Sequence, residues 1–344
     1  MDKILVVAPS WIGDCVMAQP LLARLKARPR PPRIDVLAPA WSAALFKRMA
    51  QVDAVIENPF PHGSLKLLDR LRLGRRLAAA RYDQAIVLPN SLKSALAPFF
   101  ARIPVRTGYV GEARYGLLND ARRLDKTELR LLAERYAALA EPAGAPLARP
   151  LPYPHLMVDA AARRATLTRL GLEGDGPVAV LCPGAEYGPA KRWPAPHFAA
   201  LSRALARRGY AVWLVGSAKD REIAQEIAAA ARNQGTAPVF DLCGKTSLEE
   251  AIDLVSAARL VVSNDSGLMH VAAALDRPLV ALFGSSSPAY TPPLSSRARV
   301  LHLGLPCSPC FKRVCPLGHF RCMLDLTPDR VLEELARLVP GGDP

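Results

Sequence analysis

The amino-acid sequence predicts an α/β protein with two doubly wound parallel-sheet domains. Short apolar runs typical of buried strands alternate with helical stretches along the whole chain, and this alternation indicates parallel sheets. Residues 141–154 contain five prolines and no hydrophobic periodicity, so they mark a linker between two halves. The 344 residues also exceed what one hydrophobic core usually supports.

The first half begins with a buried-type strand at 4–8, which ends at Pro9. A loop at 9–14 leads from it into a helix at 15–26. The stretch 105–120 is rich in Gly, Tyr and Arg and is expected to be a loop. Further strands are predicted at 34–38, 54–57 and 84–88, and further helices at 41–49, 65–81 and 127–139.

The second half repeats this alternation after the proline-rich stretch. Its strands are predicted at 178–182, 211–215, 239–241 and 279–283, and its helices at 196–208, 221–232, 248–257 and 328–338. The stretch 261–275 is predicted to be a strand, a tight turn and the start of a helix. We therefore expect an N-terminal domain at 1–150, a linker region at 151–177, a C-terminal domain at 178–326 and a final segment at 327–344.

The formal net charge of +14 calls for an anionic partner, which could be nucleic acid, an anionic membrane surface or a phosphorylated substrate. High-GC coding bias toward Arg offers a second explanation for part of the excess. The chain has no helix-turn-helix, RRM or zinc-finger pattern, so nucleic acid is not expected as a partner. It also lacks a Gly-x-Gly-x-x-Gly fingerprint and a Walker A motif, which argues against a dehydrogenase and a P-loop NTPase. No stretch has the length and apolarity of a membrane span, and we expect a cytoplasmic protein.

The polar turn at 263–267 is the strongest candidate for a binding site. An apolar strand stops there and an apolar helix begins, so unpaired backbone N–H groups and the helix dipole would favour a phosphate. The candidate ligand-binding residues are Asp265, Ser266, Gly267 and His270. The alternative is that Asp265 or Ser266 only caps the helix and that His270 only packs in the core.

Other loops of the second half also follow predicted strands. Gly184, Ala185 and Lys191 lie after the strand at 178–182, and Gly216 and Asp220 lie after the strand at 211–215. Because the carboxyl ends of parallel strands share one edge of a sheet, these residues would form a site for a nucleoside diphosphate. Asp220 would accept hydrogen bonds from ribose hydroxyls.

The first half offers a candidate base and candidate basic contacts. Gly13 allows close approach of the backbone, and Asp14 stands where the first helix begins. Asp14 is either a general base at the mouth of a cleft or an N-cap carboxylate. Lys93, Arg106 and Arg114 lie in predicted loops and could contact phosphate or carboxylate groups.

Four cysteines cluster near the C-terminus. Cys307, Cys310, Cys315 and Cys322, with His319 between the last two, have a spacing that fits a zinc or iron–sulfur site as well as a set of reduced thiols. The sequence alone leaves both interpretations open.

Several stretches taken together resemble one family, the ADP-heptose:lipopolysaccharide heptosyltransferases. The resemblance covers nearly the whole chain. It rests on SWIGD at 10–14, RTGY at 106–109, RYGLLND at 114–120, PGA at 183–185, KRWP at 191–194 and SNDSGLMHVAAAL at 263–275. The resemblance implies the GT-B fold, two Rossmann-like domains facing across a cleft. The N-terminal domain would bind the acceptor, the C-terminal domain would bind the donor, and the final helix would pack back on the N-terminal domain.

The resemblance also implies an activity. Family members transfer heptose from ADP-heptose with inversion and without a metal or other cofactor. The branch with a similar Cys-rich run uses as acceptor the first heptose on Kdo-lipid A, at the cytoplasmic face of the inner membrane. By position, Asp14 matches the general base, Lys191 the contact to the donor phosphates, and Asp265, Ser266, Gly267 and His270 the donor-binding turn. The same likeness favours reduced thiols over a metal in the cysteine cluster.

Other functions remain open from the sequence. A different heptosyltransferase of the family, another GT-B glycosyltransferase or a non-hydrolysing epimerase would share the fold. A non-catalytic protein that binds a nucleotide sugar or nucleic acid would use the same loops and basic surface. Loss of turnover on removal of Asp14, with donor binding retained, would separate an enzyme from a binding protein.

Overall fold

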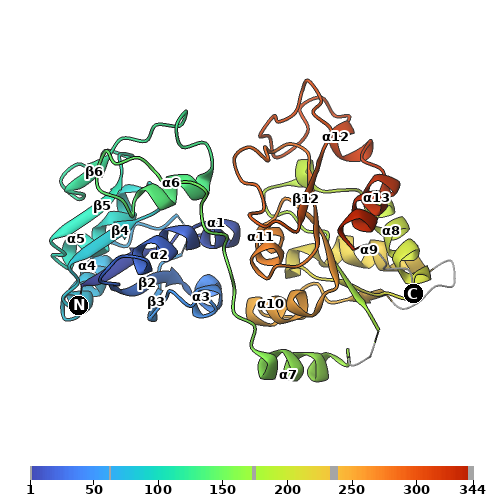
Figure 1. Ribbon diagram of the computed structural model, residues 1–344, viewed down its shortest axis with the longest axis horizontal. Coiled ribbons are helices and arrows are strands. Elements are labelled where there is room, and N and C mark those ends of the chain that lie inside the picture. The colour runs from blue at the N-terminus through green and yellow to red at the C-terminus, as the bar shows by residue number, and fades with distance from the viewer. Residues whose placement is uncertain (1, 62, 173–175, 233–238, 340–344) are drawn as a thin grey trace. The chain divides into compact units, whose positions relative to one another are not determined.

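The computed structural model describes residues 2–61, 63–172, 176–232 and 239–339. The chain divides into two compact units, Met1–Leu156 and Met157–Pro344. Within the described residues each unit contains one six-stranded sheet in which neighbouring strands run parallel (Figure 1). The predicted α/β class with two parallel-sheet domains is therefore confirmed.

The first unit has the strand order β3-β2-β1-β4-β5-β6. Its strands are β1 (Lys3–Val7), β2 (Arg33–Pro39), β3 (Ala54–Asn58), β4 (Gln84–Val87), β5 (Val105–Tyr109) and β6 (Asp120–Arg122). Its helices are α1 (Ile12–Met17), α2 (Gln19–Lys26), α3 (Ala40–Lys47), α4 (Leu67–Ala78), α5 (Leu96–Phe100) and α6 (Leu132–Ala138). A short 3-10 helix, η1 (Leu92–Ala95), precedes α5.

The second unit has the strand order β12-β11-β10-β7-β8-β9, which is the same arrangement when it is read from β9 to β12. Its strands are β7 (Val178–Cys182), β8 (Ala211–Leu214), β9 (Val239–Asp241), β10 (Leu260–Asn264), β11 (Leu279–Phe283) and β12 (Ala298–His302). Its helices are α7 (Ala160–Leu170), α8 (Ala195–Arg207), α9 (Arg221–Arg232), α10 (Leu248–Ala257), α11 (Gly267–Ala274), α12 (Arg321–Leu324) and α13 (Pro328–Leu338). The 3-10 helices are η2 (Pro189–Lys191) and η3 (Ala218–Asp220).

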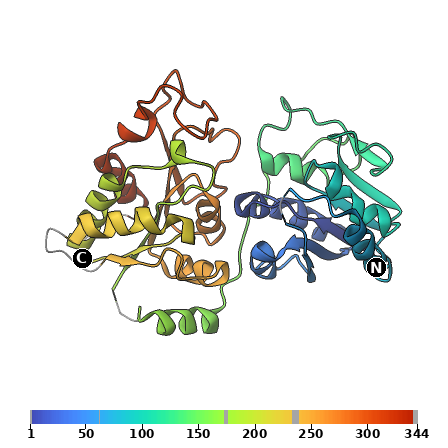
Figure 2. The ribbon, with the colours of Figure 1, turned by 180° about the vertical axis from the view of Figure 1, so that it is seen from behind.

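Apolar side chains on both faces of each sheet explain why the strands read as continuous hydrophobic runs. In the first unit, α4 and α5 pack together over one face of the sheet. A separate group of helices in contact with one another consists of α1, α2, α3 and α6. In the second unit, α8 and α9 lie side by side over one face (Figure 2). Among the described residues, no helix combines the length and the hydropathy that crossing a bilayer would require.

In both units the strand order reverses beside the first strand, between β1 and β4 and between β7 and β10. Open α/β sheets bind ligands in the crevice at this point, outside the carboxyl ends of the strands. The loops that follow these strands are therefore the places where a functional site is expected.

Two local predictions were wrong in the first unit. The predicted helix at 15–26 is two helices, because Pro20 lies in the first turn of α2 and cannot donate a backbone hydrogen bond to α1. The predicted loop at 105–120 contains β5 and ends at β6. Its Gly and Arg content hides a strand that is paired with β4.

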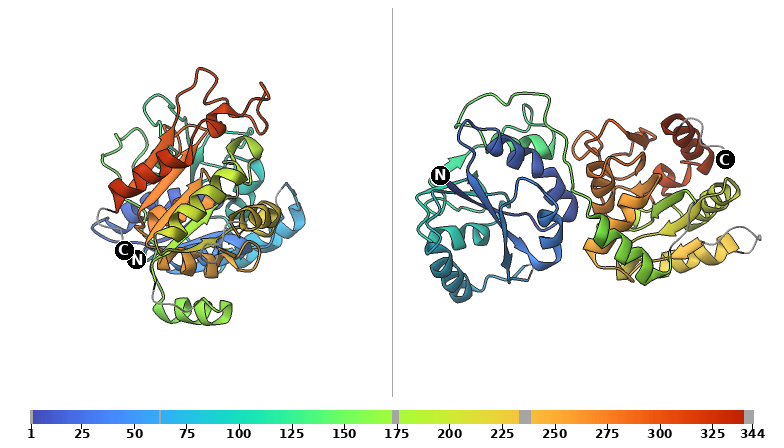
Figure 3. Two further views of the ribbon diagram at one scale, coloured as in Figure 1. Left: turned by 90° about the vertical axis from the view of Figure 1, so that its right-hand side faces the viewer. Right: turned by 60° about the horizontal axis from the view of Figure 1, so that its bottom comes forward.

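The expected domain boundaries also need correction. The linker region at 151–177 contains α7, which packs against α10 of the second unit (Figure 3). The proline-rich stretch belongs to the first unit, where Gln19 donates a hydrogen bond to the carbonyl of His155 at 2.6 Å. Helix α13 was expected to pack on the N-terminal domain. Within the second unit, its Val331 and Leu335 lie in the core, against α8 and β11.

Candidate functional site

The turn between β10 and α11 has the backbone geometry that favours an anion. Strand β10 is buried along its length, and α11 begins at Gly267. Ser266 is the N-cap residue in an extended conformation, and its side chain makes no capping hydrogen bond to the described helix. The first N–H groups of α11 therefore keep their capacity to bind a ligand, and the helix dipole favours a negative charge there.

Lys191 lies beside this turn. It is the last residue of η2, in the loop after β7, and its Nζ is 2.5 Å from Oδ2 of Asp265. The hydroxyl of Ser286 also donates to Oδ2 of Asp265 at 2.5 Å. Asp265 is only 6% exposed, so the ion pair fixes the ammonium group at the start of α11. The structure thus brings together the predicted Lys191 and the predicted turn, 74 residues apart in sequence.

Asn264 is the last residue of β10, and it binds both ends of the loop that joins β7 to α8, here called the Lys191 loop. Its Oδ1 accepts from the backbone N–H of Trp193 at 3.1 Å, and its Nδ2 donates to the carbonyl of Pro183 at 2.8 Å. The indole of Trp193 is fully buried and donates to the carbonyl of Leu326 at 2.7 Å. Sequence analysis missed Asn264 and Ser286, because nothing in their local sequence reveals partners that lie so far along the chain.

The Cys-rich segment supports the same loop. The hydroxyl of Tyr187 donates to the carbonyl of Phe311 at 2.8 Å, and the N–H of Ala190 donates to the carbonyl of Arg313 at 3.0 Å. The ammonium of Lys191 lies 5.2 Å from the centre of the Tyr187 ring, a cation–π distance. Lys191 is therefore positioned by contacts from three separate parts of the second unit.

His270 lies in the second turn of the same helix and is 4% exposed. The pKa of its imidazole is lowered from 6.5 to about 4, mainly by burial, with Asp265 opposing the shift and the nearby Lys191 adding to it. His270 is therefore neutral near pH 7. It can act on a ligand through a hydrogen bond but not through a full positive charge.

Asp220 has a structural role in the described contacts. Its Oδ2 accepts from the backbone N–H of Ser217 at 2.9 Å and from the Ser217 hydroxyl at 2.8 Å. A Cβ on Gly184 would collide with this carboxylate, and a Cβ on Gly216 would lie in tight contact with it at 3.0 Å. Ala185 is buried beside Gly184. In the described contacts, Asp220, Gly184 and Gly216 pack the two loops together, and the predicted ribose contact of Asp220 stays a prediction.

Asp14 lies at the switch point of the first unit. Helix α1 begins at Ile12, and its N-cap residue is Trp11, whose side chain makes no capping hydrogen bond. Asp14 is the third residue of the helix, so it is not the N-cap residue. Gly13 is buried in the same turn, whereas Asp14 is partly exposed at the carboxyl edge of the sheet.

The structure places the guanidinium groups of Arg106 and Arg114, which were predicted as anion contacts, against backbone carbonyls. Arg114 is 2% exposed, and its guanidinium donates to the carbonyls of Tyr109 and Pro89 at 2.6 and 2.5 Å. Arg106 donates to the carbonyl of Leu117 at 2.7 Å and also to a second backbone carbonyl. Both arginines satisfy backbone acceptors of irregular loops, a role that buried arginine fills because it carries five donors.

Lys93 remains a candidate contact. It lies in η1, after the carboxyl end of β4, and its side chain is partly exposed. Two exposed tryptophans that sequence analysis did not single out lie at the same edge of the sheet. The indole of Trp41 donates to the carbonyl of Ser10 at 3.0 Å, and Trp11 follows Ser10 in the chain. Exposed indole rings at such an edge offer apolar faces to a ligand.

Comparison with known proteins decides the family. The family model "Glycosyltransferase family 9 (heptosyltransferase)" matches residues 70–321. The chain is 51% identical over 98% of its length to lipopolysaccharide heptosyltransferase 2 of Salmonella typhimurium, and covers 98% of that protein. The chain belongs to glycosyltransferase family 9. The Escherichia coli lipopolysaccharide heptosyltransferase 2 is 49% identical over 98% of both chains.

Solved structures of the family have the same fold. The structure of E. coli ADP-heptose lps heptosyltransferase II superimposes with a TM-score of 0.88 at 48% identity, with 98% of each chain covered. The E. coli heptosyltransferase WaaC with ADP-2-deoxy-2-fluoro heptose gives a TM-score of 0.71 at 23% identity and supports the fold alone. This family 9 chain is therefore a glycosyltransferase built from two Rossmann-like units.

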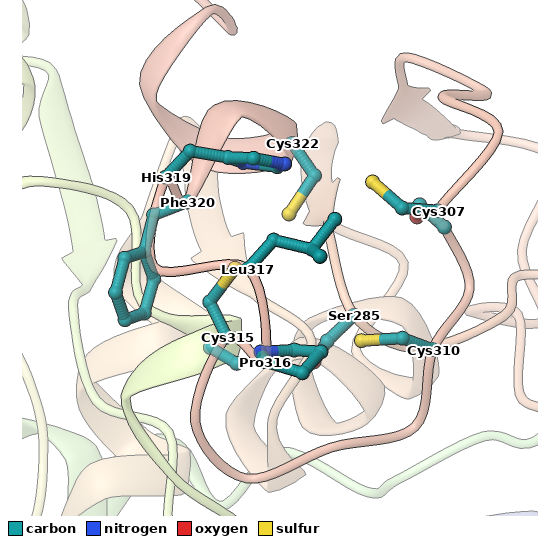
Figure 4. Close-up of a pocket in the computed structure, with 11 residues that line it drawn as sticks. Ser285, Cys307, Cys310, Cys315, Pro316, Leu317, His319, Phe320 and Cys322 are labelled. Carbon is teal, nitrogen blue, oxygen red and sulfur yellow. The ribbon is translucent and has the colours of Figure 1, made fainter.

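The four C-terminal cysteines of this family 9 chain line one pocket together with His319 (Figure 4). All are free thiols. Backbone N–H groups of residues 317–320 surround the sulfur of Cys315 and lower the pKa of its thiol, whereas burial raises the pKa of Cys322. Within the described part of the chain, no group of three or more His, Cys, Asp or Glu side chains is arranged to hold a metal ion.

Proposed function

We propose that this family 9 glycosyltransferase transfers L-glycero-D-manno-heptose from ADP-heptose to the first heptose of the lipopolysaccharide inner core. The names of its relatives, including lipopolysaccharide heptosyltransferase 2 at 51% identity, support heptose transfer to lipopolysaccharide. The observation that carries the proposal is the Lys191–Asp265 pair at the uncapped start of α11. This arrangement suits the diphosphate of a nucleotide sugar.

The donor diphosphate would bind the N–H groups of Ser266 and Gly267 and the ammonium of Lys191. When the bond between the anomeric carbon and the diphosphate breaks, its electron pair leaves with ADP. Lys191 and the dipole of α11 would stabilise the added negative charge, and they are already in position before the reaction. We infer that the transfer needs no metal and no other cofactor, because these groups supply the positive charge.

Asp14 would act as the general base. The acceptor hydroxyl would attack the anomeric carbon from the face opposite the diphosphate, and its proton would pass to the Asp14 carboxylate. This attack inverts the anomeric configuration. The position of Asp14 at the switch point, partly exposed and not used as the N-cap, supports this role. Lys93 lies at the same edge and would contact the anionic acceptor.

The acceptor, heptosyl-Kdo-lipid A, is anchored in a membrane by its lipid. We therefore propose that the protein is cytoplasmic and associates peripherally with the cytoplasmic face of the inner membrane. The net charge of +14 supports attraction to an anionic leaflet and to acceptor phosphates. The proposed partners are thus ADP-heptose, the Kdo-lipid A acceptor and the anionic membrane surface, with no nucleic acid.

A transfer assay with EDTA present tests the proposal. Purified protein would be incubated with ADP-heptose and a mono-heptosylated Kdo-lipid A acceptor, and ADP release and acceptor mass would be followed. We expect a gain of one heptose that Asp14→Ala abolishes and that Asp125→Ala, at an exposed loop aspartate, leaves intact. Donor binding without transfer by the wild-type protein would instead favour a binding protein or a different acceptor.

A further inference from the structure

Three exposed leucines gather where α4 begins. Leu65 is 53% exposed, Leu67 is 49% exposed and Leu68 is 67% exposed. Leu67 and Leu68 form the first turn of the helix, and Leu65 lies just before it. Single exposed apolar residues are ordinary on protein surfaces, but a contiguous group of large ones marks an interaction site.

A buried arginine holds these leucines in place. The guanidinium of Arg70 donates to the carbonyl of Leu65 at 2.6 Å and to the carbonyl of Lys93 at 3.0 Å. Its guanidinium also stacks 4.1 Å from the centre of the Phe60 ring. Arg70 thus ties the loop before α4 to η1, so the leucines are presented on a supported surface and not on a free loop.

Positive side chains surround the leucines. Lys66 is exposed between Leu65 and Leu67, and Arg72, Arg75 and Arg76 are exposed on the following turns of α4. Only Asp69, paired with Arg72 at 2.8 Å, offsets them in the exposed part of this helix. With a rise of about 1.5 Å per residue, Arg72 lies roughly 6 Å and Arg76 roughly 12 Å along the helix from Leu68. The apolar side chains therefore lie at the start of α4, and the cations lie on its later turns.

This surface lies at the functional edge of the first unit. Strand β3 ends at Asn58, and the chain passes from its carboxyl end into α4. Asp14 follows β1, and β1 and β3 run parallel on either side of β2, so their carboxyl ends share one edge. The leucines and the proposed acceptor base are therefore at the same edge of one sheet.

We propose that Leu65, Lys66, Leu67, Leu68, Arg72, Arg75 and Arg76 form a docking surface for an anionic lipid bilayer. The leucines enter the boundary between headgroups and acyl chains, and the cations contact lipid phosphates. A bilayer of this kind offers both an apolar layer for the leucines and negative charge for the cations that follow them along α4. The inference rests on the proposed function, because it places the lipid-anchored acceptor at the edge that carries Asp14.

Vesicle sedimentation tests the surface without any substrate. The full chain is mixed with vesicles of phosphatidylethanolamine and phosphatidylglycerol, or with vesicles of phosphatidylcholine alone. We expect binding to the anionic vesicles, and Leu67→Ser with Leu68→Ser should weaken it about tenfold or more. Arg72→Gln with Arg75→Gln should weaken it and reduce its salt dependence. The control Val314→Ser with Leu324→Ser removes two exposed apolar residues of the second unit and should bind as wild type does.

The docking surface is wrong if the wild-type protein ignores anionic vesicles, or if the leucine variant binds as wild type does. It is also wrong if the control variant loses as much binding, since the effect would then be general hydrophobicity. A wild-type dimer that the leucine variant dissociates, with no vesicle binding, would assign the surface to a second copy of the chain.

A second measurement separates this surface from the activity itself. Transfer is measured on an acceptor embedded in anionic vesicles and on the same acceptor stripped of its acyl chains. The leucine variant should lose turnover only on the vesicle acceptor. Loss on both acceptors would place Leu67 and Leu68 in the acceptor site and overturn the docking surface. If wild type binds vesicles but glycosylates neither acceptor, the proposed function fails and the surface stands.

Discussion

The contact between Lys191 and Asp265 places one positive charge beside the start of a helix, where a single side chain can control both binding and reaction. Asp265 is buried, and the hydroxyl of Ser286 also donates to it. The carboxylate therefore keeps a hydrogen-bond partner when Lys191 is removed. Substitution of Lys191 can thus test its chemistry without stripping Asp265 of every partner.

We predict that Lys191→Ala lowers kcat by roughly 10²-fold, because the departing diphosphate loses a pre-positioned cation. Steady-state ADP release measures the effect, and thermal unfolding checks that the protein is folded. Lys219→Ala is the matched control, since Lys219 pairs with Glu186 on a neighbouring exposed loop. Equal losses in the two variants would contradict a specific role for Lys191.

The buried His270 predicts a dependence of stability on pH. Its pKa is about 4 in the folded protein and near 6.5 in the unfolded chain, so the unfolded chain binds the proton first. The stability that His270 contributes is present above pH 6.5 and falls as the pH drops toward 4. The loss is about 2 kcal/mol at pH 5. Denaturant unfolding at pH 7.5 and pH 5 should show a smaller loss in His270→Gln. An equal loss of stability in the wild-type protein and in His270→Gln would contradict this contribution of His270.

At the scale of elements, the loop between β7 and α8 is shaped by one side chain of β10. Asn264 binds the backbone at Pro183 and at Trp193, the two ends of this loop. Because both bonds are buried, the loop and the turn before α11 cannot move apart without leaving polar groups unpaired. The position of Lys191 is therefore set by the strand and not by the loop alone.

Asn264→Ala is expected to weaken ADP binding at least tenfold and to destabilise the second unit by about 2–4 kcal/mol, the cost of two lost buried hydrogen bonds. Calorimetric titration with ADP measures the affinity. Asn119→Ala provides the comparison, because Asn119 also makes two backbone hydrogen bonds but lies in the first unit. Weaker ADP binding in Asn119→Ala would show that the loss follows general destabilisation.

At the scale of the whole molecule, the proposed function divides the chemistry between two units with the same strand order. The proposed phosphate-binding turn belongs to the second unit and the proposed base to the first. The final helix α13 belongs to the second unit, because Val331 and Leu335 complete its core. Stability and donor binding should therefore both respond to changes in α13.

Leu335→Ala should destabilise the second unit by about 2–5 kcal/mol, because it leaves a cavity in a buried apolar cluster. Thermal unfolding with and without ADP measures the effect, and Glu333→Ala, at an exposed position of the same helix, should change little. If Leu335→Ala unfolds at the wild-type temperature, α13 does not support the core as its contacts indicate.

Much of the fold follows from local sequence pattern. The bounds of β7, α9, α10, β11 and α13 match the predictions. The two strands are short continuous apolar runs, and the three helices have a clear helical pattern of apolar residues. Strand β5 and helix α7 were not predicted. Gly108 and Arg106 are atypical of a buried strand, so the segment of β5 was interpreted as a loop. The prolines that precede α7 led to its interpretation as part of a linker.

The site was predictable only in part. The turn at 263–267 and Lys191 could be found, since strand-to-helix turns and a lysine in a neighbouring loop are visible in the sequence. The burial of Arg114 could not be found, because its partners are backbone carbonyls whose positions depend on tertiary structure. For the same reason the hydrogen bonds from Ser217 to the carboxylate of Asp220 could not be predicted.

The support that the Cys-rich segment gives to the Lys191 loop comes through main-chain atoms. Tyr187 and Ala190 bond the carbonyls of Phe311 and Arg313, and the N–H of Phe311 donates to the carbonyl of Ser285 at 2.7 Å. Gly188 completes this contact, because a Cβ there would meet the carbonyl of Arg313 at 2.5 Å. Besides these main-chain bonds, the guanidinium of Arg313 lies 5.4 Å from the centre of the Tyr187 ring. An insertion or deletion between 307 and 313 would shift the register of the main-chain bonds, so we expect it to displace the Lys191 loop.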